Sequence, residues 1–213
     1  MRDTLLDDAV KLTPPRGSRR ILAVAGPPAA GKSTLARRLV AGVDARLGAD
    51  AAGYVPLDGF HLSNAQLDRL DVRGRKGAPF TFDVDGYLEL LHRLRRDLSS
   101  PIYVPDYDRV LHEPIAARHV IWPRTRLVVT EGNYLASRDP GWRDVADVAD
   151  AVWLVDAPDA VREERLMRRH AGGDRPEAEA RERTVGNDRP NGEYVRRSLR
   201  PEVRLVDPQD PTP

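Results

Sequence analysis

One stretch near the N-terminus has residue types and a spacing that fit phosphate binding. Its eight residues, Gly26-Pro-Pro-Ala-Ala-Gly31-Lys32-Ser33, match the pattern G-x-x-x-x-G-K-[ST]. Small residues between the glycines leave room for backbone N–H groups to turn toward phosphate oxygens, and a helix that starts at the lysine adds its dipole. We expect Lys32 to reach the β and γ phosphates of a nucleotide and Ser33 to bind Mg²⁺ through its hydroxyl. The predicted nucleotide-binding residues are Gly26, Pro27, Pro28, Ala29, Ala30, Gly31, Lys32, Ser33 and Thr34.

The segments on either side of this loop have the patterns that such a loop requires. Residues 20–25, RILAVA, form an unbroken apolar run, which is typical of a strand buried on both faces of a parallel sheet. After the loop, four apolar residues recur in steps of four and predict an amphipathic helix. These residues are Leu35, Leu39, Val43 and Leu47. Strand, loop and helix in this order favour a phosphate-binding loop over an ordinary glycine-rich turn.

Two further predicted strands end in an acidic residue. Residues 54–57 lead into Asp58 and Gly59, and residues 126–130 lead into Glu131. In a doubly wound sheet, ligands bind outside the carboxyl ends of the strands, so Asp58 is expected to face the γ-phosphate across the crevice. A carboxylate there can act as a general base that accepts the proton of an attacking hydroxyl. The alternative is a turn-forming Asp-Gly pair. The phosphate loop together with Glu131 favours the base.

Several classes of phosphate-loop protein find no support in the sequence. Proteins that read guanine carry Asn-Lys-x-Asp, but none of the three lysines, Lys11, Lys32 and Lys76, follows an asparagine. The strand before Glu131 ends in one acid rather than the Asp-Glu pair of ATPase motors, and the Leu-Ser-Gly-Gly signature of transporter ATPases is missing. What remains is a small-molecule kinase, in which the protein mainly positions the reactants and neutralises charge during phosphoryl transfer.

Six stretches then carry a family resemblance that covers about residues 18–200. In chain order they are GPPAAGKS, PLDGFH, RKGAPFTFDVDGY, PDYDRVLHEP, LVVTEGNYL and RLMRRH. The chain resembles the uridine kinase, pantothenate kinase and phosphoribulokinase group of P-loop kinases. Within this group it is most similar to the bacterial nucleoside/nucleotide kinase family, or fructose-transport-system kinase, proteins. The resemblance implies a three-layer α/β/α P-loop NTPase fold with a central, mostly parallel sheet, an Arg-rich lid, and ATP and Mg²⁺ as cofactors.

The resemblance also implies roles for individual residues. Asp58 is expected to be the general base, and Glu131 to act near Mg²⁺ through its bound waters. Tyr107 and His112 fall in the Tyr-Asp segment where uridine kinases place substrate contacts. The implied reaction is ATP-dependent phosphorylation of a hydroxyl on a small metabolite. A nucleoside, a pantothenate-like molecule and a sugar are all left open as the acceptor.

A lid at about residues 165–190 is the last part of the implied site. Arg165 and Arg169 match an Arg-Leu-x-Arg-Arg pattern, and guanidinium groups there would stabilise charge on the phosphoryl group while closure excludes water. The sequence His170-Ala-Gly-Gly-Asp-Arg175 follows in place of the family's usual Arg-Asp. Because of this departure, a nucleotide-dependent regulatory or assembly protein with little phosphotransfer activity is the alternative function.

Three further candidates each have two interpretations. Lys76, with Arg73 and Arg75, either holds an anionic acceptor such as a carboxylate or sugar phosphate, or belongs to a solvated basic loop. His61 either hydrogen-bonds the acceptor or packs at the end of its strand. Residues 187–191 either touch the adenine or form a loop with capping asparagines, and we favour the loop.

Positioning these residues requires the alternation of strands and helices that the rest of the sequence shows. Helical spacing marks residues 3–12, and Asp83 is a good N-cap for a helix that runs to about residue 98. The other expected elements are a short helix at 64–70, a proline-broken strand region at 102–123, a strand at 151–155, helices at about 158–170 and 176–184, and a short strand at 203–206. This order predicts an α/β fold with a parallel sheet.

The composition limits the fold and its partners further. A chain of 213 residues forms one domain, and its lack of cysteine excludes disulfides and Cys-based metal sites. With 34 basic and 33 acidic residues, it has no electrostatic footprint of a nucleic-acid binder. No signal peptide or membrane span is recognisable, so we expect a cytoplasmic protein with a small-molecule acceptor and no nucleic-acid or membrane partner, and a homodimer is left open. The expected division is a helical extension at 1–17, a kinase domain at 18–200 and a Pro-rich tail at 201–213.

Overall fold

The chain forms a five-stranded parallel sheet whose spatial order differs from the order of the strands in the sequence. The computed structural model describes residues 3–171 and 177–208. Across the sheet the order is β2-β5-β1-β6-β7, and every neighbouring pair is parallel. The strands are β1 (Arg20–Ala25), β2 (Ala52–Pro56), β5 (Leu127–Gly132), β6 (Ala151–Val155) and β7 (Arg204–Val206). The predicted central parallel sheet is therefore confirmed.

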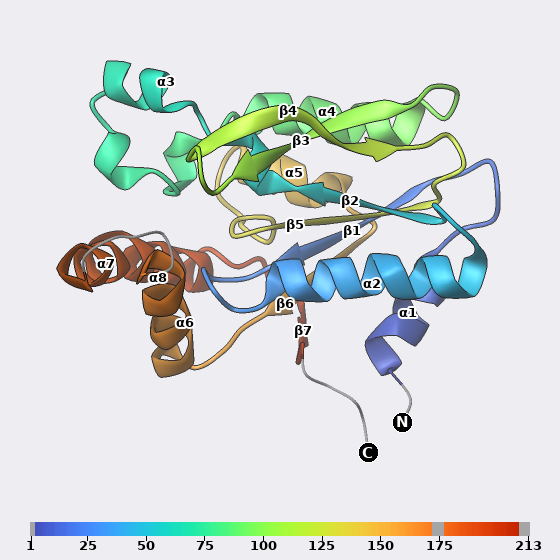
Figure 1. The fold of residues 1–213 in the computed structure, drawn as a ribbon. Helices are drawn as coiled ribbons and strands as arrows, with labels where there is room; N and C mark the ends of the chain where they lie inside the picture. The colour runs from blue at the N-terminus through green and yellow to red at the C-terminus, as the bar shows by residue number, and fades with distance from the viewer. Residues whose placement is uncertain (1–2, 172–176, 209–213) are drawn as a thin grey trace.

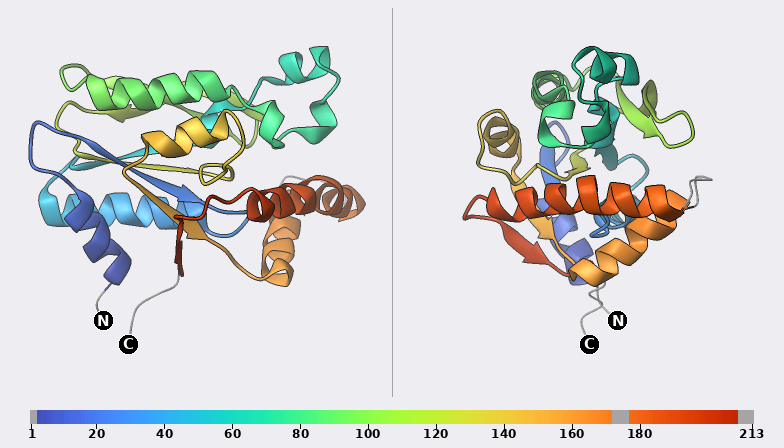
Figure 2. Two further views of the ribbon diagram at one scale, coloured as in Figure 1. Left: turned by 180° about the vertical axis from the view of Figure 1, so that it is seen from behind. Right: turned by 90° about the vertical axis from the view of Figure 1, so that its left-hand side faces the viewer.

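Helices cover both faces of this sheet, as Figures 1 and 2 show. On one face lie α1 (Thr4–Leu12) and α2 (Lys32–Leu47), and on the other lie α4 (Val84–Arg96) and α5 (Trp142–Val148). As predicted, Asp83 caps α4, because its side chain accepts a hydrogen bond from the Gly86 backbone N–H at 2.9 Å. The result is the expected three-layer α/β/α arrangement.

The apolar run of β1 supplies side chains to both layers. Ile21 and Ala23 belong to the core that includes α4 and α5, whereas Leu22 and Val24 belong to the core that includes α1 and α2. Successive side chains of a strand point to opposite faces, so a strand between two helical layers is apolar at every position. This double burial fixes β1, and with it the start of the phosphate loop.

Both ends of the described chain join the central domain. Leu5 and Ala9 of α1 are almost fully buried in the core that contains α2. The Asp3 carboxylate caps α1 by accepting a hydrogen bond from the Leu6 backbone N–H. At the other end, β7 extends the sheet beyond β6. The segments expected as an extension and a tail therefore supply part of the core and the edge of the sheet.

The proline-broken region after α4 folds into an antiparallel hairpin. β3 (Ile102–Asp108) pairs with β4 (Glu113–Ile121), and their register shifts between Val104 and Asp106. Pro105 lies at this irregularity, where a residue without a backbone N–H is tolerated. The hairpin tip, residues 109–112, reaches the end of the molecule where the parallel strands have their carboxyl ends (Figure 1).

The remaining helices gather around the same end of the molecule (Figures 1 and 2). They are α6 (Asp159–Ala171), α7 (Glu177–Arg183), a π-helical turn (Thr184–Asp188), α8 (Arg189–Arg197), the short α3 (Asn64–Arg69), and 3₁₀ turns at Leu57–Phe60, Arg73–Arg75 and Pro79–Thr81. Residues 172–176 of the expected lid, which include Arg175, lie outside the described residues. Within the described ranges, no helix combines the length and the apolar character needed to cross a membrane.

Candidate active site

The phosphate loop connects β1 to α2, and its conformation depends on glycine. Gly26 has φ +150°, and a Cβ atom added there would lie 2.0 Å from the carbonyl oxygen of Val155 in β6. Gly31 has φ +106°, a left-handed conformation that other residues rarely adopt, and α2 begins at the next residue. The first N–H groups of α2 have no acceptor within the helix, so they are available to a ligand. The loop therefore offers backbone donors to an anion.

Lys32, the first residue of α2, is buried beneath the phosphate loop. Its Nζ donates hydrogen bonds to the Pro27 carbonyl oxygen at 3.0 Å and to Oδ1 of Asn133 at 2.7 Å. Burial lowers the pKa of Lys32 to about 8, although the negative charges of Glu131 and Asp58 oppose this shift. The ammonium group is therefore mostly protonated at neutral pH and can bind a phosphate.

Ser33 and Glu131 lie together at the carboxyl end of β5. Oε1 of Glu131 accepts hydrogen bonds from Ser33 Oγ at 3.0 Å and from the Tyr54 hydroxyl at 2.7 Å. Burial and the charge of nearby Asp58 raise the pKa of Glu131. A hydroxyl and a carboxylate are oxygen ligands that suit Mg²⁺, so this pair fits the metal expected beside the phosphates. Among the described residues, no group of three or more His, Asp or Glu could hold a metal ion, so further ligands would come from nucleotide and water.

Asp58 lies on the 3₁₀ turn after β2 and faces the same cavity. Its neighbour Gly59 lets β3 approach, because a Cβ atom there would lie 2.4 Å from a carbonyl oxygen of β3. Oδ2 of Asp58 is 3.5 Å from Nη2 of Arg109, and Oδ1 is 4.0 Å from Nδ1 of His61. Burial alone would raise the pKa of Asp58, but His61 in its protonated form and the permanent charges of Arg109 and Arg169 outweigh it and hold this pKa below its ordinary value. The carboxylate is therefore ionised at neutral pH and able to accept a proton.

Aromatic side chains stand next to Asp58 at the end of the cavity away from the phosphate loop. The His61 ring packs against Phe82 and Tyr107, with centroids 4.1 and 4.9 Å apart, and its Nδ1 lies 2.8 Å from the Asp58 carbonyl oxygen. Burial lowers the pKa of His61. His61 thus packs at the strand end and also lines the cavity, and its hydrogen bond to the acceptor stays a prediction. Tyr107 and His112 line the cavity with it.

Lys76 also lines this end of the cavity, but it is not solvated, since 7% of its side chain is exposed. Its ammonium group has three partners: Asn64 Oδ1 at 2.9 Å, the His112 carbonyl oxygen at 2.7 Å and Glu113 Oε2 at 3.6 Å. Acceptors in three directions suit an ammonium group better than a planar guanidinium. Lys76 therefore anchors the hairpin tip to α3, and the interpretation as a solvated loop residue is wrong for it.

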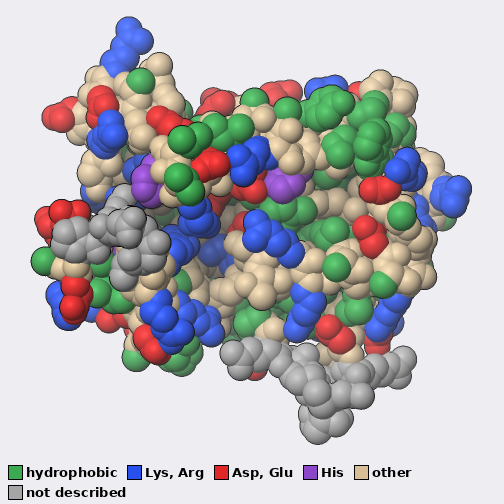
Figure 3. Space-filling view, in the orientation of Figure 1, with side chains coloured by type: hydrophobic (Ala, Val, Ile, Leu, Met, Phe, Trp, Pro, Cys, Tyr) green, Lys and Arg blue, Asp and Glu red, His purple; other side chains and the backbone are tan. Residues whose placement is uncertain are grey.

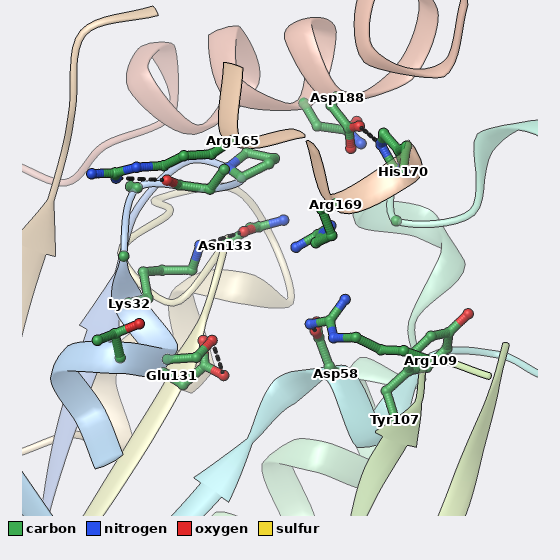
Figure 4. A pocket seen from close by; sticks show the side chains of 18 of the residues that line it. Lys32, Asp58, Tyr107, Arg109, Glu131, Asn133, Arg165, Arg169, His170 and Asp188 are labelled. Atoms are coloured by element: carbon green, nitrogen blue, oxygen red, sulfur yellow. Dashed lines mark hydrogen bonds and ion pairs between the residues drawn. The ribbon is translucent and has the colours of Figure 1, made fainter. Parts of the chain in front are cut away.

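Arginines of α6 lie beside the phosphate loop and contact it. Arg162 and Arg165 donate hydrogen bonds to carbonyl oxygens of the loop at 3.3 and 3.1 Å. Arg169 points into the cavity and donates no hydrogen bond to another described residue (Figure 4). His170 pairs with Asp188 at 2.8 Å, which ties α6 to the π-helical turn. The guanidinium group of Arg169 is therefore available to a ligand in the cavity.

A single cavity of about 1000 Å³ gathers most of the predicted site residues. Lys and Arg side chains surround its mouth in Figure 3, and Figure 4 shows its interior. The predicted residues that line it are Pro28, Ala29, Ala30, Gly31, Lys32, Ser33, Thr34, Asp58, His61, Lys76, Tyr107, His112, Glu131, Arg165 and Arg169. Gly26 and Pro27 belong to the loop without lining the cavity. Arg73 lies outside, where it pairs with Asp68 at 2.6 Å on the exposed surface.

Other residues line the cavity without having been singled out in the sequence. Arg109 and Asn133 lie within the stretches PDYDRVLHEP and LVVTEGNYL. Their positions close to Tyr107 and Glu131 in the sequence could have identified them as site residues. Arg183 comes from α7 and Pro208 from the segment after β7, where no motif marks them. The prediction of a capping loop at residues 187–191 is wrong, because these residues lie in the π-helical turn and the first turn of α8, and Asn191 lines the cavity.

The sequence matches individual proteins across most of its length. It is 32% identical over 203 residues to a Schizosaccharomyces pombe protein named "Putative uridine kinase", which covers 92% of this chain and 86% of that protein. It is 31% identical over 159 residues to "ATP-dependent kinase-like protein notR'" of Aspergillus versicolor, which covers 70% of this chain and 92% of that protein. A comparison with models of protein families finds no match.

The fold also matches a solved structure over nearly the whole chain. The crystal structure of a "putative fructose transport system kinase" from Silicibacter sp. TM1040 superposes with a TM-score of 0.86 and 34% sequence identity. The match covers 95% of this chain and 97% of that chain, so it extends well beyond the phosphate loop. The chain therefore belongs to the P-loop kinases of the uridine kinase group.

Proposed function

We propose that this kinase transfers the γ-phosphoryl group of ATP, with Mg²⁺ bound, to a hydroxyl group of a small metabolite. The observation that carries the proposal is the presence of Asp58 in one cavity with Lys32, Ser33 and Glu131. An ionised carboxylate, a buried lysine and a pair of metal-type ligands are components that phosphoryl transfer needs. The volume of about 1000 Å³ also lies at the upper end of the range for small-molecule sites, which suits a nucleotide and an acceptor together.

In this proposal Asp58 activates the acceptor. Its carboxylate takes the hydroxyl proton while the hydroxyl oxygen forms a bond to the γ-phosphorus, and the bond from that phosphorus to the β–γ bridging oxygen breaks. Lys32 and Arg169 neutralise negative charge on the phosphoryl oxygens. Mg²⁺ beside Ser33 and Glu131 would supply further positive charge. The products are ADP and the phosphorylated acceptor.

The acceptor is proposed to occupy the end of the cavity lined by His61, Tyr107 and Lys76. An imidazole and a phenol suit a small molecule with several hydroxyl groups, while Lys76 holds the hairpin tip that borders this end. The names of the relatives point to uridine in one case and to fructose transport in another. Nucleosides and sugars are therefore the first candidates, and a pantothenate-like molecule is the third.

An assay of ADP release tests this function. Purified protein with Mg·ATP is supplied with separate panels of nucleosides, sugars and vitamins related to pantothenate. We expect one panel to raise ADP release well above the rate without acceptor. A release rate that responds to none of them, combined with nucleotide-dependent binding of a protein partner, would favour the regulatory alternative.

Replacement of Asp58 tests the general base. Asp58→Asn should lower kcat with the acceptor about 10²- to 10⁴-fold, because proton transfer is lost. Binding of Mg·ADP, measured by calorimetry, should persist. Asp68→Asn is the control, since Asp68 pairs with Arg73 on the surface outside the cavity. Nearly full turnover by Asp58→Asn would remove Asp58 from the mechanism.

A further inference from the structure

Asn133 emerges from the sheet beside the first residue of the phosphate loop. In the register of β1 and β5, Ala25 is opposite Gly132. The next residue of each strand therefore leaves the sheet at the same point, and these residues are Gly26 and Asn133. The Asn133 side chain lines the cavity between the phosphate loop and α6 (Figure 4). It thus lies where the phosphates of a nucleotide would meet the end of β5.

Hydrogen-bond chemistry fixes the orientation of the Asn133 amide. Its Oδ1 accepts a hydrogen bond from Lys32 Nζ at 2.7 Å. A lysine ammonium can only donate, so the amide oxygen has to face Lys32 and the NH₂ group has to face away. Figure 4 shows the amide nitrogen directed toward Arg169. The side chain therefore holds Lys32 with its oxygen and presents its donors to the cavity.

The space between Asn133 and Arg169 is bordered by donors. The Asn133 NH₂ group and the Arg169 guanidinium both carry N–H donors, and the Asn133 side chain also lies within hydrogen-bonding reach of the Tyr134 hydroxyl. Arg169 donates no hydrogen bond to another described residue, and Lys32 lies on the other side of Asn133. An amide NH₂ group has two N–H donors, so one is left beside the Tyr134 hydroxyl, and donors that converge from Asn133 and Arg169 are suited to an anionic oxygen. On the proposed function, that oxygen belongs to the group transferred to the acceptor.

We propose that Asn133 is a catalytic residue that donates a hydrogen bond to a non-bridging oxygen of the γ-phosphoryl group. The inference rests on the proposed use of ATP and adds a residue to the same site. Asn133 acts at both ends of its amide, since the oxygen positions Lys32 and the nitrogen stabilises charge on the phosphoryl group. The amide proton stays on nitrogen throughout, and the acceptor proton goes to Asp58.

The residue after Asn133 keeps the amide in place. Tyr134 is buried, and its hydroxyl donates a hydrogen bond to the Gly77 carbonyl oxygen. Its ring packs against Trp142 and Tyr194 with centroids 5.1 and 5.6 Å apart. A donor that is fixed before the reaction needs no reorganisation when charge develops, which makes it more effective in the transition state. The buried Tyr134 therefore supports Asn133 as a preorganised donor.

Two substitutions of Asn133 separate donation to phosphate from the holding of Lys32. Asn133→Asp keeps an acceptor for Lys32 and loses the donor, whereas Asn133→Ala loses both. The probes are Mg·ADP and Mg·AMP-PNP, an ATP analogue with a γ-phosphoryl group, and calorimetry gives both affinities without an acceptor. Because Lys32 loses a partner in Asn133→Ala and a carboxylate is added beside the phosphates in Asn133→Asp, we expect both variants to bind Mg·ADP up to about tenfold more weakly than the wild type. We expect them to bind Mg·AMP-PNP about 10- to 100-fold more weakly, with Asn133→Asp the weaker. With the acceptor found by the ADP-release assay, kcat should fall about 10²- to 10³-fold.

Equal losses with the two nucleotides would overturn the inference. If Asn133 only holds Lys32, each variant weakens Mg·ADP and Mg·AMP-PNP by a similar factor, and the additional loss with the γ-phosphoryl analogue is absent. Asn64→Asp is the matched control, because Asn64 also accepts a hydrogen bond from a lysine, Lys76, at 2.9 Å but lies outside the cavity lining. It should leave both nucleotide affinities unchanged. A wild-type protein that binds neither nucleotide would contradict the proposed function itself, and thermal melting shows that each variant is folded.

Discussion

The Lys32 ammonium group lies between two acceptors at the edge of the cavity. It is buried, and the Pro27 carbonyl oxygen and Asn133 Oδ1 lie 3.0 and 2.7 Å from its nitrogen. A guanidinium is planar and wider, so it cannot make the same two bonds from this position. We predict that Lys32→Arg weakens Mg·AMP-PNP binding about 100-fold in calorimetry. Lys11→Arg, on a side chain that is 76% exposed, is the control and should leave the affinity unchanged.

On the proposed mechanism, the charge beside Asp58 would set the acidic limit of activity. Its pKa is held below the ordinary value by His61 and Arg109 against the effect of burial. The ionised base is present above this pKa, so kcat/KM is lost as the pH falls through it. We predict that Arg109→Gln removes one positive neighbour, raises the pKa of Asp58, and moves the acidic limb of kcat/KM to higher pH.

Pairs of pH profiles check this shift. Arg118→Gln provides the comparison, since Arg118 pairs with Asp108 at 2.9 Å instead of with Asp58. Its acidic limb should coincide with that of the wild type. An Arg109→Gln profile that also coincides with the wild type would show that Arg109 does not tune the base.

At the scale of the elements, the phosphate loop depends on the close approach of β6. A Cβ atom at Gly26 would lie 2.0 Å from the Val155 carbonyl oxygen, whereas a Cβ atom at Gly17 would meet nothing within 4 Å. Both glycines have positive φ, so replacement of either by Ala costs backbone strain of about 1–3 kcal/mol. We predict that Gly26→Ala lowers the free energy of unfolding by about 1–3 kcal/mol more than Gly17→Ala, because the phosphate loop and β6 have to move apart. Urea unfolding of the two variants measures the difference, and equal losses would contradict this account.

Elements with a local signal were predictable, and elements that depend on distant pairing were not. The strand 20–25, the phosphate loop and α2 follow from hydrophobic period and glycine positions within about thirty residues. The region 102–123 was recognised as strand-like, but its folding into an antiparallel hairpin depends on a register that composition does not encode. The place of Asn133 likewise depends on β5 pairing with β1, which brings together residues about a hundred positions apart.

At the scale of the whole molecule, the N-terminal helix belongs to the core. The sequence indicated a helix at residues 3–12, but its amphipathic pattern could not show which surface it covers. Leu5 is 2% exposed and packs with Leu35 and Leu39 of α2, the helix that follows the phosphate loop. We predict that Leu5→Ala lowers the free energy of unfolding by about 2–5 kcal/mol, as in other cores that lose a buried leucine side chain. Leu205→Ala, at a side chain that is 69% exposed, should change it by less than about 0.5 kcal/mol in the same urea titration.

The strand order has a consequence for synthesis on the ribosome. β1 is made early, yet its two neighbours in the sheet are β5 and β6, which begin at Leu127 and Ala151. At translation rates of about 5–20 residues per second, roughly 5–20 seconds pass between the emergence of β1 and that of β5. During this time a strand with apolar side chains on both faces has no partner, so the nascent chain presents a binding site for chaperones that shield apolar segments. The cavity closes later still, since Pro208 is among its lining residues. The lining of the cavity is therefore complete only after all five strands of the parallel sheet have been translated.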